Sequence, residues 1–200
     1  MRKKIISAAM LVALTAGAVC AQDGVEKSKL QFGVRAGYSV NGMQQDDGRD
    51  VQTFEGVGWQ VGGSAGYNLG EFSGVSSQIH IGVEAGLLFS NRMYFVDNDL
   101  NSLYSVEIPI VTAYTEQFAP PLFFKWQLGP RFRFGLAGSH EVFNKFRHIN
   151  FGLTTGVGMG IGRFFLGTSY NIDLFNIAQN APSWHTQRMI STDLTLGWNF

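Results

Sequence analysis

Charged residues are scarce in this chain of 200 residues. Asp, Glu, Lys and Arg make up 15 % of the sequence and balance to a formal net charge of zero, whereas about 25 % is usual. This balance excludes a basic protein that binds nucleic acid and an acidic disordered tail. The mean hydropathy of +0.03 excludes a helical transporter, and the abundance of Gly and aromatic residues excludes a coiled coil.

Cysteine is almost absent, and the single one, Cys20, lies in a segment typical of a signal peptide. A basic start precedes an apolar run over residues 5–19, which at about 15 residues is too short for a permanent membrane span. Small residues around Cys20 predict cleavage after Ala21. Lipidation of Cys20 is the competing interpretation, but residues 17–19 lack the Leu of a lipobox.

Removal of residues 1–21 leaves 12 basic and 15 acidic residues, a formal charge of −3, and no cysteine. No disulfide can therefore hold the exported chain, which depends on its fold alone.

Strict alternation of apolar and polar residues dominates the remaining sequence. Leu30, Phe32 and Val34 begin one face of a twelve-residue segment whose other face begins with Gln31 and Gly33. Strands of globular proteins usually have about five or six residues. The alternation recurs in eight segments: 30–41, 57–67, 79–89, 104–114, 124–136, 151–161, 164–174 and 190–200.

The polar face of these segments is rich in glycine, which a solvent-facing strand surface normally avoids. Small residues mixed with opposite charges are typical of the packed interior of a narrow barrel. Because buried charges need partners, we expect an ion-pair network in the lumen. Its predicted members are Arg35, Glu84, Glu107, Lys125, Arg131 and Arg133.

The sequence therefore predicts an all-β fold, an eight-stranded antiparallel up-and-down transmembrane β-barrel with its apolar face toward lipid. Its predicted divisions are a cleavable signal peptide (1–21), a periplasmic segment (22–29) and one barrel domain (30–200). Pro109 and Pro130 lie within predicted strands and indicate local bulges or bends, because Pro donates no ladder hydrogen bond.

The predicted connections alternate in length. Long polar loops are expected at 42–55, 90–101, 138–148 and 177–187, and shorter turns at 70–76, 115–121 and 162–163. Outer-membrane barrels have long external loops, short periplasmic turns and, with an even number of strands, periplasmic termini. This order predicts a location in the cell outer membrane.

Several short motifs resemble the PorT-like outer membrane protein β-barrel family. They are Phe32-Gly-Val-Arg-Ala-Gly-Tyr38, Glu107-Ile108-Pro109, Leu128-Gly129-Pro130, and the glycine-rich segment 151–160 followed by Tyr170. The resemblance implies an eight-stranded barrel in a Gram-negative outer membrane and no single activity.

The C-terminus resembles the signal by which assembly machinery recognises outer-membrane barrels. Leu194, Leu196, Trp198 and Phe200 alternate up to the last residue. The resemblance implies that barrel-assembly machinery is a partner during insertion.

Two acidic segments, 46–50 and 97–99, contain possible Ca²⁺ ligands but lack the pattern of an EF-hand loop. His140, His148 and the segment Ser183-Trp184-His185 lie in predicted external loops, where no spacing fixes a nucleophile beside a base. We therefore expect no enzymatic activity, no cofactor and no metal site.

Three functions remain open. A monomeric, non-catalytic barrel would support the envelope or bind an unknown extracellular ligand through its four long loops. A narrow, porin-like conduit for small solutes or hydrophobic ligands would need an open lumen, which eight strands barely leave. A soluble lipocalin-type barrel would explain the alternation but not the glycine-rich polar face. Lipid is the expected partner for the first two functions. A nucleic-acid partner is expected for none of the three.

Overall fold

The computed structural model describes residues 30–46, 51–73, 77–96, 99–139, 147–175 and 186–200. The predicted signal peptide, its cleavage site at Ala21 and the predicted periplasmic segment lie outside these residues. No helix in the described part of the chain is long and apolar enough to cross a membrane.

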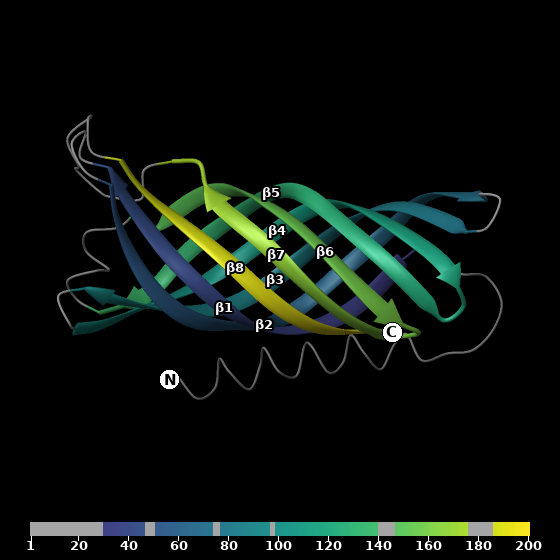
Figure 1. The fold of residues 1–200 in the computed structure, drawn as a ribbon, viewed down its shortest axis with the longest axis horizontal. Helices are drawn as coiled ribbons and strands as arrows, with labels where there is room; N and C mark the ends of the chain where they lie inside the picture. Colours follow the sequence, from purple (N-terminus) through teal and green to yellow (C-terminus); the bar gives the residue numbers. More distant parts are fainter. Residues whose placement is uncertain (1–29, 47–50, 74–76, 97–98, 140–146, 176–185) are drawn as a thin grey trace.

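The described residues form a closed antiparallel barrel in which every strand pairs with its neighbours in sequence (Figure 1). The last strand pairs with the first over Gly33–Asn199 to Asp46–Thr186. The predicted fold class is therefore confirmed. The strands are β1 (Leu30–Asp46), β2 (Val51–Ser73), β3 (Gln78–Val96), β4 (Asp99–Ala119), β5 (Leu122–Gly138), β6 (Ile149–Ile161), β7 (Phe164–Asp173) and β8 (Thr186–Asn199).

Alternating side chains of each strand face lipid and lumen, because successive side chains of a strand point to opposite faces. In β1, Tyr38 and Val40 are about half exposed on the outside, whereas Ser39 and Asn41 are buried inside. Exposed Leu, Ile, Val and aromatic residues cover the outer wall, and the buried polar residues lie within the lumen. The barrel is therefore apolar outside and polar inside.

Aromatic side chains mark two levels on the outer wall. Trp59 lies 5.7 Å from Phe89 and Phe89 lies 6.2 Å from Tyr104, between ring centroids. Tyr67 is eight residues beyond Trp59 in β2. At about 3.3 Å per residue and a tilt of about 40°, the two levels are about 20 Å apart. This height suits the apolar band of an outer-membrane barrel.

Several strands are longer than predicted, and two predicted loops and two predicted turns are wrong in their bounds. β2 runs to Ser73 and β4 to Ala119, into the predicted turns 70–76 and 115–121. β1 continues to Asp46 and β2 begins at Val51, so most of 42–55 is strand; β3 and β4 likewise occupy most of 90–101. Alternation weakens there because the outer residues face water beyond the aromatic level, whereas backbone pairing continues. The gaps after β5 and β7 fall at the predicted loops 138–148 and 177–187.

Pro109 and Pro130, predicted to cause bulges or bends, produce no register shift, although strand pairing is interrupted beside each of them. The register between β3 and β4 is the same at Ala85–Ile110 and at Leu88–Glu107, on either side of Pro109. Gly86 makes room for the ring, since a Cβ there would lie 2.9 Å from Pro109 Cγ. The register shifts occur elsewhere, at Asn68/Gly70, Tyr104/Ser105 and Gln117/Ala119.

The two ends of the barrel differ. One end, which we call the turn end, carries Leu30, Phe200 and the tight turn at Gly162, whose φ of 60° is the left-handed region that favours glycine. At the opposite end, the loop end, β1 ends at Asp46, β2 begins at Val51, β3 ends at Val96 and β4 begins at Asp99 (Figure 1).

Deletion of Phe200 tests the predicted assembly signal at the turn end. Phe200 is 43 % exposed, and its backbone N–H donates to the Phe32 carbonyl at 2.8 Å. Burial of a Phe side chain contributes roughly 1.5–3 kcal/mol, too little to decide whether the barrel forms. We expect strongly reduced outer-membrane levels in cells, measured by fractionation, while the purified chain still refolds in detergent. Normal levels in cells would make Phe200 an ordinary interfacial aromatic residue.

Candidate functional site

A buried ion-pair network fills the half of the lumen nearer the loop end. At its centre, the guanidinium of Arg92 in β3 binds the carboxylate of Glu107 in β4 through two parallel bonds, Nε to Oε1 at 2.9 Å and Nη2 to Oε2 at 3.0 Å. Arg131 Nη1 donates to the same carboxylate at 3.0 Å, and Ser90 Oγ donates at 2.8 Å. Glu107 therefore joins three neighbouring strands.

A second carboxylate, Asp173 at the end of β7, extends the network. Arg131 Nη2 donates to Asp173 Oδ1 at 3.2 Å and Arg133 Nη2 donates to Oδ2 at 2.5 Å. Asn150 Nδ2 also donates to Oδ2, at 3.2 Å, and Arg133 contacts the sulfur of Met189. Asp173 thereby ties β7 to β5 and β6.

The third carboxylate, Asp193, extends the network to the last strand, β8. Arg92 Nη1 lies 3.4 Å from Asp193 Oδ1 and 2.6 Å from Asn41 Oδ1. Asn171 Nδ2 donates to Asp193 Oδ2 at 2.8 Å. The network therefore crosses the seam between β8 and β1.

Three arginines and three carboxylates balance in this network, and each side chain is at most 5 % exposed. Burial of a charge is unfavourable unless partners and hydrogen bonds compensate it. Every carboxylate here accepts from at least two groups. The network is thus an electrically neutral, cross-linked plug.

A second, smaller charge cluster lies nearer the turn end. Glu84 Oε1 accepts from Arg35 Nη2 at 3.2 Å, and Glu84 Oε2 accepts from Lys125 Nζ. The Phe165 ring packs between the two cations, 5.4 Å from Arg35 Cζ and 5.5 Å from Lys125 Nζ. Gly158 leaves space for that ring, because a Cβ there would lie 2.4 Å from it.

Two cavities lie on either side of this cluster. The inner one, of about 90 Å³, lies between the plug and the cluster, and its lining includes Gln60 and Arg131. Gln60 Oε1 and Arg131 Nε are buried and have no hydrogen-bond partner among the described residues.

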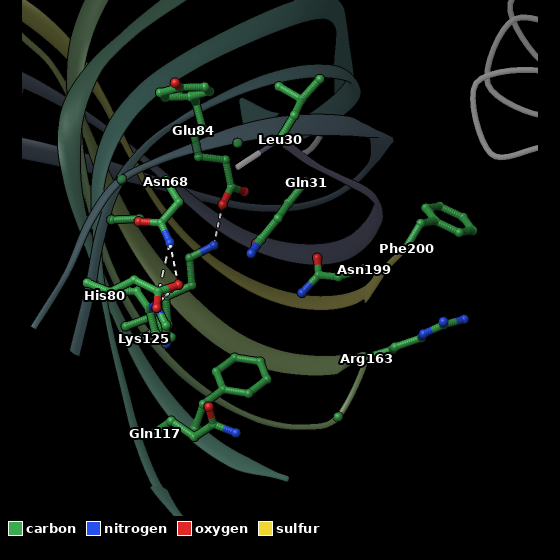
Figure 2. Close-up of a pocket in the computed structure, with 18 of the residues that line it drawn as sticks. Leu30, Gln31, Asn68, His80, Glu84, Gln117, Lys125, Arg163, Asn199 and Phe200 are labelled. Carbon is green, nitrogen blue, oxygen red and sulfur yellow. Dashed lines mark hydrogen bonds and ion pairs between the residues drawn. The ribbon is translucent and has the colours of Figure 1, made fainter. Parts of the chain in front are cut away.

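The larger cavity, of about 570 Å³, opens at the turn end, and we call it the vestibule (Figure 2). Glu84 and Lys125 border it on the lumen side, and Phe200 and Arg163 lie at its mouth. Its side walls include Asn68, Glu71, His80, Thr115 and Gln117 from β2, β3 and β4.

The structure divides the six predicted lumen charges between these clusters. Arg35, Glu84 and Lys125 form the smaller cluster, while Glu107, Arg131 and Arg133 belong to the plug. Arg133 binds Asp173, although Glu107 is opposite it in the register.

Sequence reasoning missed Arg92 as a member of the network because it fell in a predicted loop. The signal was present, since Arg92 has the same parity in β3 as Glu84.

The other candidate residues lie on the outer wall or outside the described residues. Leu194 and Leu196 are exposed on the outer wall, in line with Trp198 and Phe200. His148 is exposed just before β6, and its carbonyl accepts from the Gly135 amide at 2.7 Å. Residues 47–50, 97–98, His140 and 183–185 lie outside the described part of the chain. Within that part, no cluster of three His, Cys, Asp or Glu residues is arranged to hold a metal ion.

Comparison of the sequence with protein families gives one decisive match. The family described as "Outer membrane protein beta-barrel domain" matches residues 9–189. The chain belongs to this family. Because barrels of the outer membrane turn their termini and short turns toward the periplasm, we expect the vestibule to open to the periplasm and the loop end to face outward. No curated protein matches the sequence.

Solved barrels of the outer membrane are similar in fold at low sequence identity. The outer membrane enzyme PagL shares 12 % identity over 80 % of this chain and 98 % of its own, with a TM-score of 0.45. Neisserial surface protein A shares 13 % over 84 % and 97 %, with a TM-score of 0.49. Ail of Yersinia pestis, in complex with the heparin analogue sucrose octasulfate, shares 13 % over 86 % and 99 %, with a TM-score of 0.43.

The sequence-based exclusion of enzymatic activity is wrong. PagL, one of these solved barrels, is an outer membrane enzyme. The correction assigns no reaction to this chain.

Replacement of Glu107 by Ala tests the plug. The change leaves the guanidinium of Arg92 buried without its two-bond partner, and loss of one partner of a buried pair typically costs about 3–5 kcal/mol. We expect the free energy of unfolding in urea, followed by tryptophan fluorescence in lipid vesicles, to fall by about that amount. The control is Glu55→Ala, at an exposed carboxylate of β2. Equal losses in the two variants would contradict a stabilising role for the plug.

Proposed function

We propose that this outer-membrane barrel supports the envelope as a closed scaffold and binds an extracellular partner at its loop end. The plug of Arg92, Glu107, Arg131, Arg133, Asp173 and Asp193 carries the proposal. A lumen filled by paired charges favours a rigid support over a solute path.

The length of β3 and β4 supports the choice of surface. Tyr104 belongs to the aromatic level of Trp59 and Phe89, which is the level nearer the loop end. β4 begins five residues before Tyr104, at Asp99. Its partner β3 runs on to Val96. A paired hairpin of this kind extends beyond the lipid band and offers Leu100, which is 55 % exposed, to the surroundings. Ordered strands lose less conformational entropy on binding than a flexible loop does.

Site-specific photo-crosslinking in intact cells tests the proposal. We expect a crosslinker at Leu100 to give a discrete product with a partner outside the cell, and one at the lipid-facing Leu196 to give none. A matched variant, tested for co-purification of the partner that the Leu100 crosslink identifies, replaces residues 93–102 by a two-residue Asn-Gly turn, which joins Arg92 to its register partner Leu103. This variant keeps the plug and should lose the interaction. The same products from Leu100 and Leu196 would contradict the proposal.

The alternative function, a narrow conduit, is tested by electrical conductance. If the plug stays closed, the purified barrel in a planar bilayer gives no stable conductance steps. Regular steps that grow in the Glu107→Ala variant would favour the conduit instead.

A further inference from the structure

An irregularity in β2 turns a carboxylate into the vestibule. Up to Tyr67 the odd-numbered residues of β2 face outward, so regular alternation would also point Glu71 outward. The register shifts between Asn68–Gly82 and Gly70–Ile81, which leaves Leu69 as an extra, exposed residue. Beyond this bulge, Glu71 is paired with His80. Bulges commonly re-aim a side chain in this way.

Hydrogen bonds fix the re-aimed carboxylate against the imidazole. Glu71 Oε1 lies 3.2 Å from His80 Nδ1 and accepts from Asn68 Nδ2 at 3.2 Å, while Asn68 Oδ1 accepts from the Gly70 amide in the bulge at 3.1 Å. A carboxylate at Nδ1 favours the tautomer that carries its proton there. The other ring nitrogen, Nε2, is left for a hydrogen bond with a molecule in the vestibule.

The strand register continues this row of polar groups around the wall. His80 pairs with Thr115 of β4, and Thr115 pairs with Lys125 of β5, so an imidazole, a hydroxyl and an ammonium follow one another at one level. Gln117 lies two residues further along β4 and also lines the vestibule. The Phe123 ring adds an apolar surface beside them.

Stability alone does not account for this arrangement. The side chains of His80 and Glu71 are 20 % and 50 % exposed, and ion pairs at such sites contribute about 0–1 kcal/mol. The bulge that brings them together also interrupts the strand ladder. A constellation that contributes little to the fold and faces an open cavity is typical of a binding site.

The charges around the vestibule indicate which ligands suit it. The formal side-chain charges that line the vestibule balance, with Glu71 and Glu84 against Lys125 and Arg163. With no net side-chain charge to match, the ligand would meet chiefly the Nε2 atom of His80, the Thr115 hydroxyl and the Gln117 amide. Hydroxyl- and amide-bearing rings match this set, since their polar edges bind such groups and their apolar faces pack against an aromatic ring.

We propose that the vestibule is a periplasmic binding site for a short, uncharged saccharide, with Glu71 as the positioning residue for His80. The cavity of about 570 Å³ falls within the usual range for small-ligand sites, about 300–1,000 Å³. A sugar with N-acetyl groups and a sugar with hydroxyls alone share this chemistry, and they would come from cell-wall glycan and from dissolved solute respectively.

Calorimetric titration of the purified barrel tests the site. The detergent must be zwitterionic, because glucoside and maltoside head groups would compete. The three probes are di-N-acetylchitobiose, maltose and triglycine. Binding of either sugar supports the proposal, and the tighter one identifies the source. Binding of triglycine alone would overturn it in favour of a peptide site, and no binding of any probe would also overturn it.

Variants separate recognition from folding. We expect His80→Ala to weaken sugar binding about tenfold, the loss of one hydrogen bond. Glu71→Ala should weaken it less and shift the ¹⁵N resonances of His80 toward a mixture of tautomers, while Glu71→Gln restores much of the affinity. Glu116→Gln, at the same end on the outer wall, is the control and should bind as the parent does. Heat-modifiable migration in unboiled gels verifies that each barrel is closed. Undiminished binding by folded His80→Ala would contradict the site.

Discussion

Closure of the backbone ladder between β8 and β1 is the constraint on which the rest of this structure depends. Inside a lipid layer no water is available for an exposed amide or carbonyl, so a sheet can span the layer only if it has no edge. Fourteen residue pairs, from Gly33–Asn199 to Asp46–Thr186, remove that edge. Once the sheet closes, the alternation of side chains divides the chain into a lipid-facing wall and a narrow lumen. Every polar group that faces the lumen must then find partners there.

The lumen satisfies this requirement differently at its two ends. Toward the outside, long arginines reach across the interior and pair with carboxylates of distant strands, which leaves little free volume. Toward the periplasm, glycines replace long side chains in β6, and the remaining charges are drawn to the wall around Glu84 and Phe165. The same fold therefore combines a rigid, filled half with a half that keeps a cavity. The two proposals place partner binding at the filled end and ligand binding at the hollow one.

Sequence periodicity was sufficient for the architecture because lipid imposes a regular apolar face for the whole height of the membrane. The strand number, the faces and the tight turn at Gly162 followed from it. Periodicity failed where lipid no longer acts on the outer face, as at Arg92, and where one residue breaks the register, as at Leu69. Neither position has a local signature: an arginine beyond the lipid band resembles a loop residue, and a bulge is decided by pairing with another strand. The partners of each charge also depend on distances across the lumen, which no single strand contains.

The distribution of the plug over the strands has a consequence for the order of assembly. Arg92, Arg131, Arg133 and Glu107 belong to β3, β4 and β5, whereas Asp173 and Asp193 belong to β7 and β8. A sheet that has formed only through β5 therefore brings three of these cations together with one anion. The plug residues of such a partial sheet carry an excess of two positive charges until β7 and β8 join it. Electrostatic attraction between the two sets of plug residues therefore favours the joining of β7 and β8 to β3, β4 and β5, in addition to the backbone ladder.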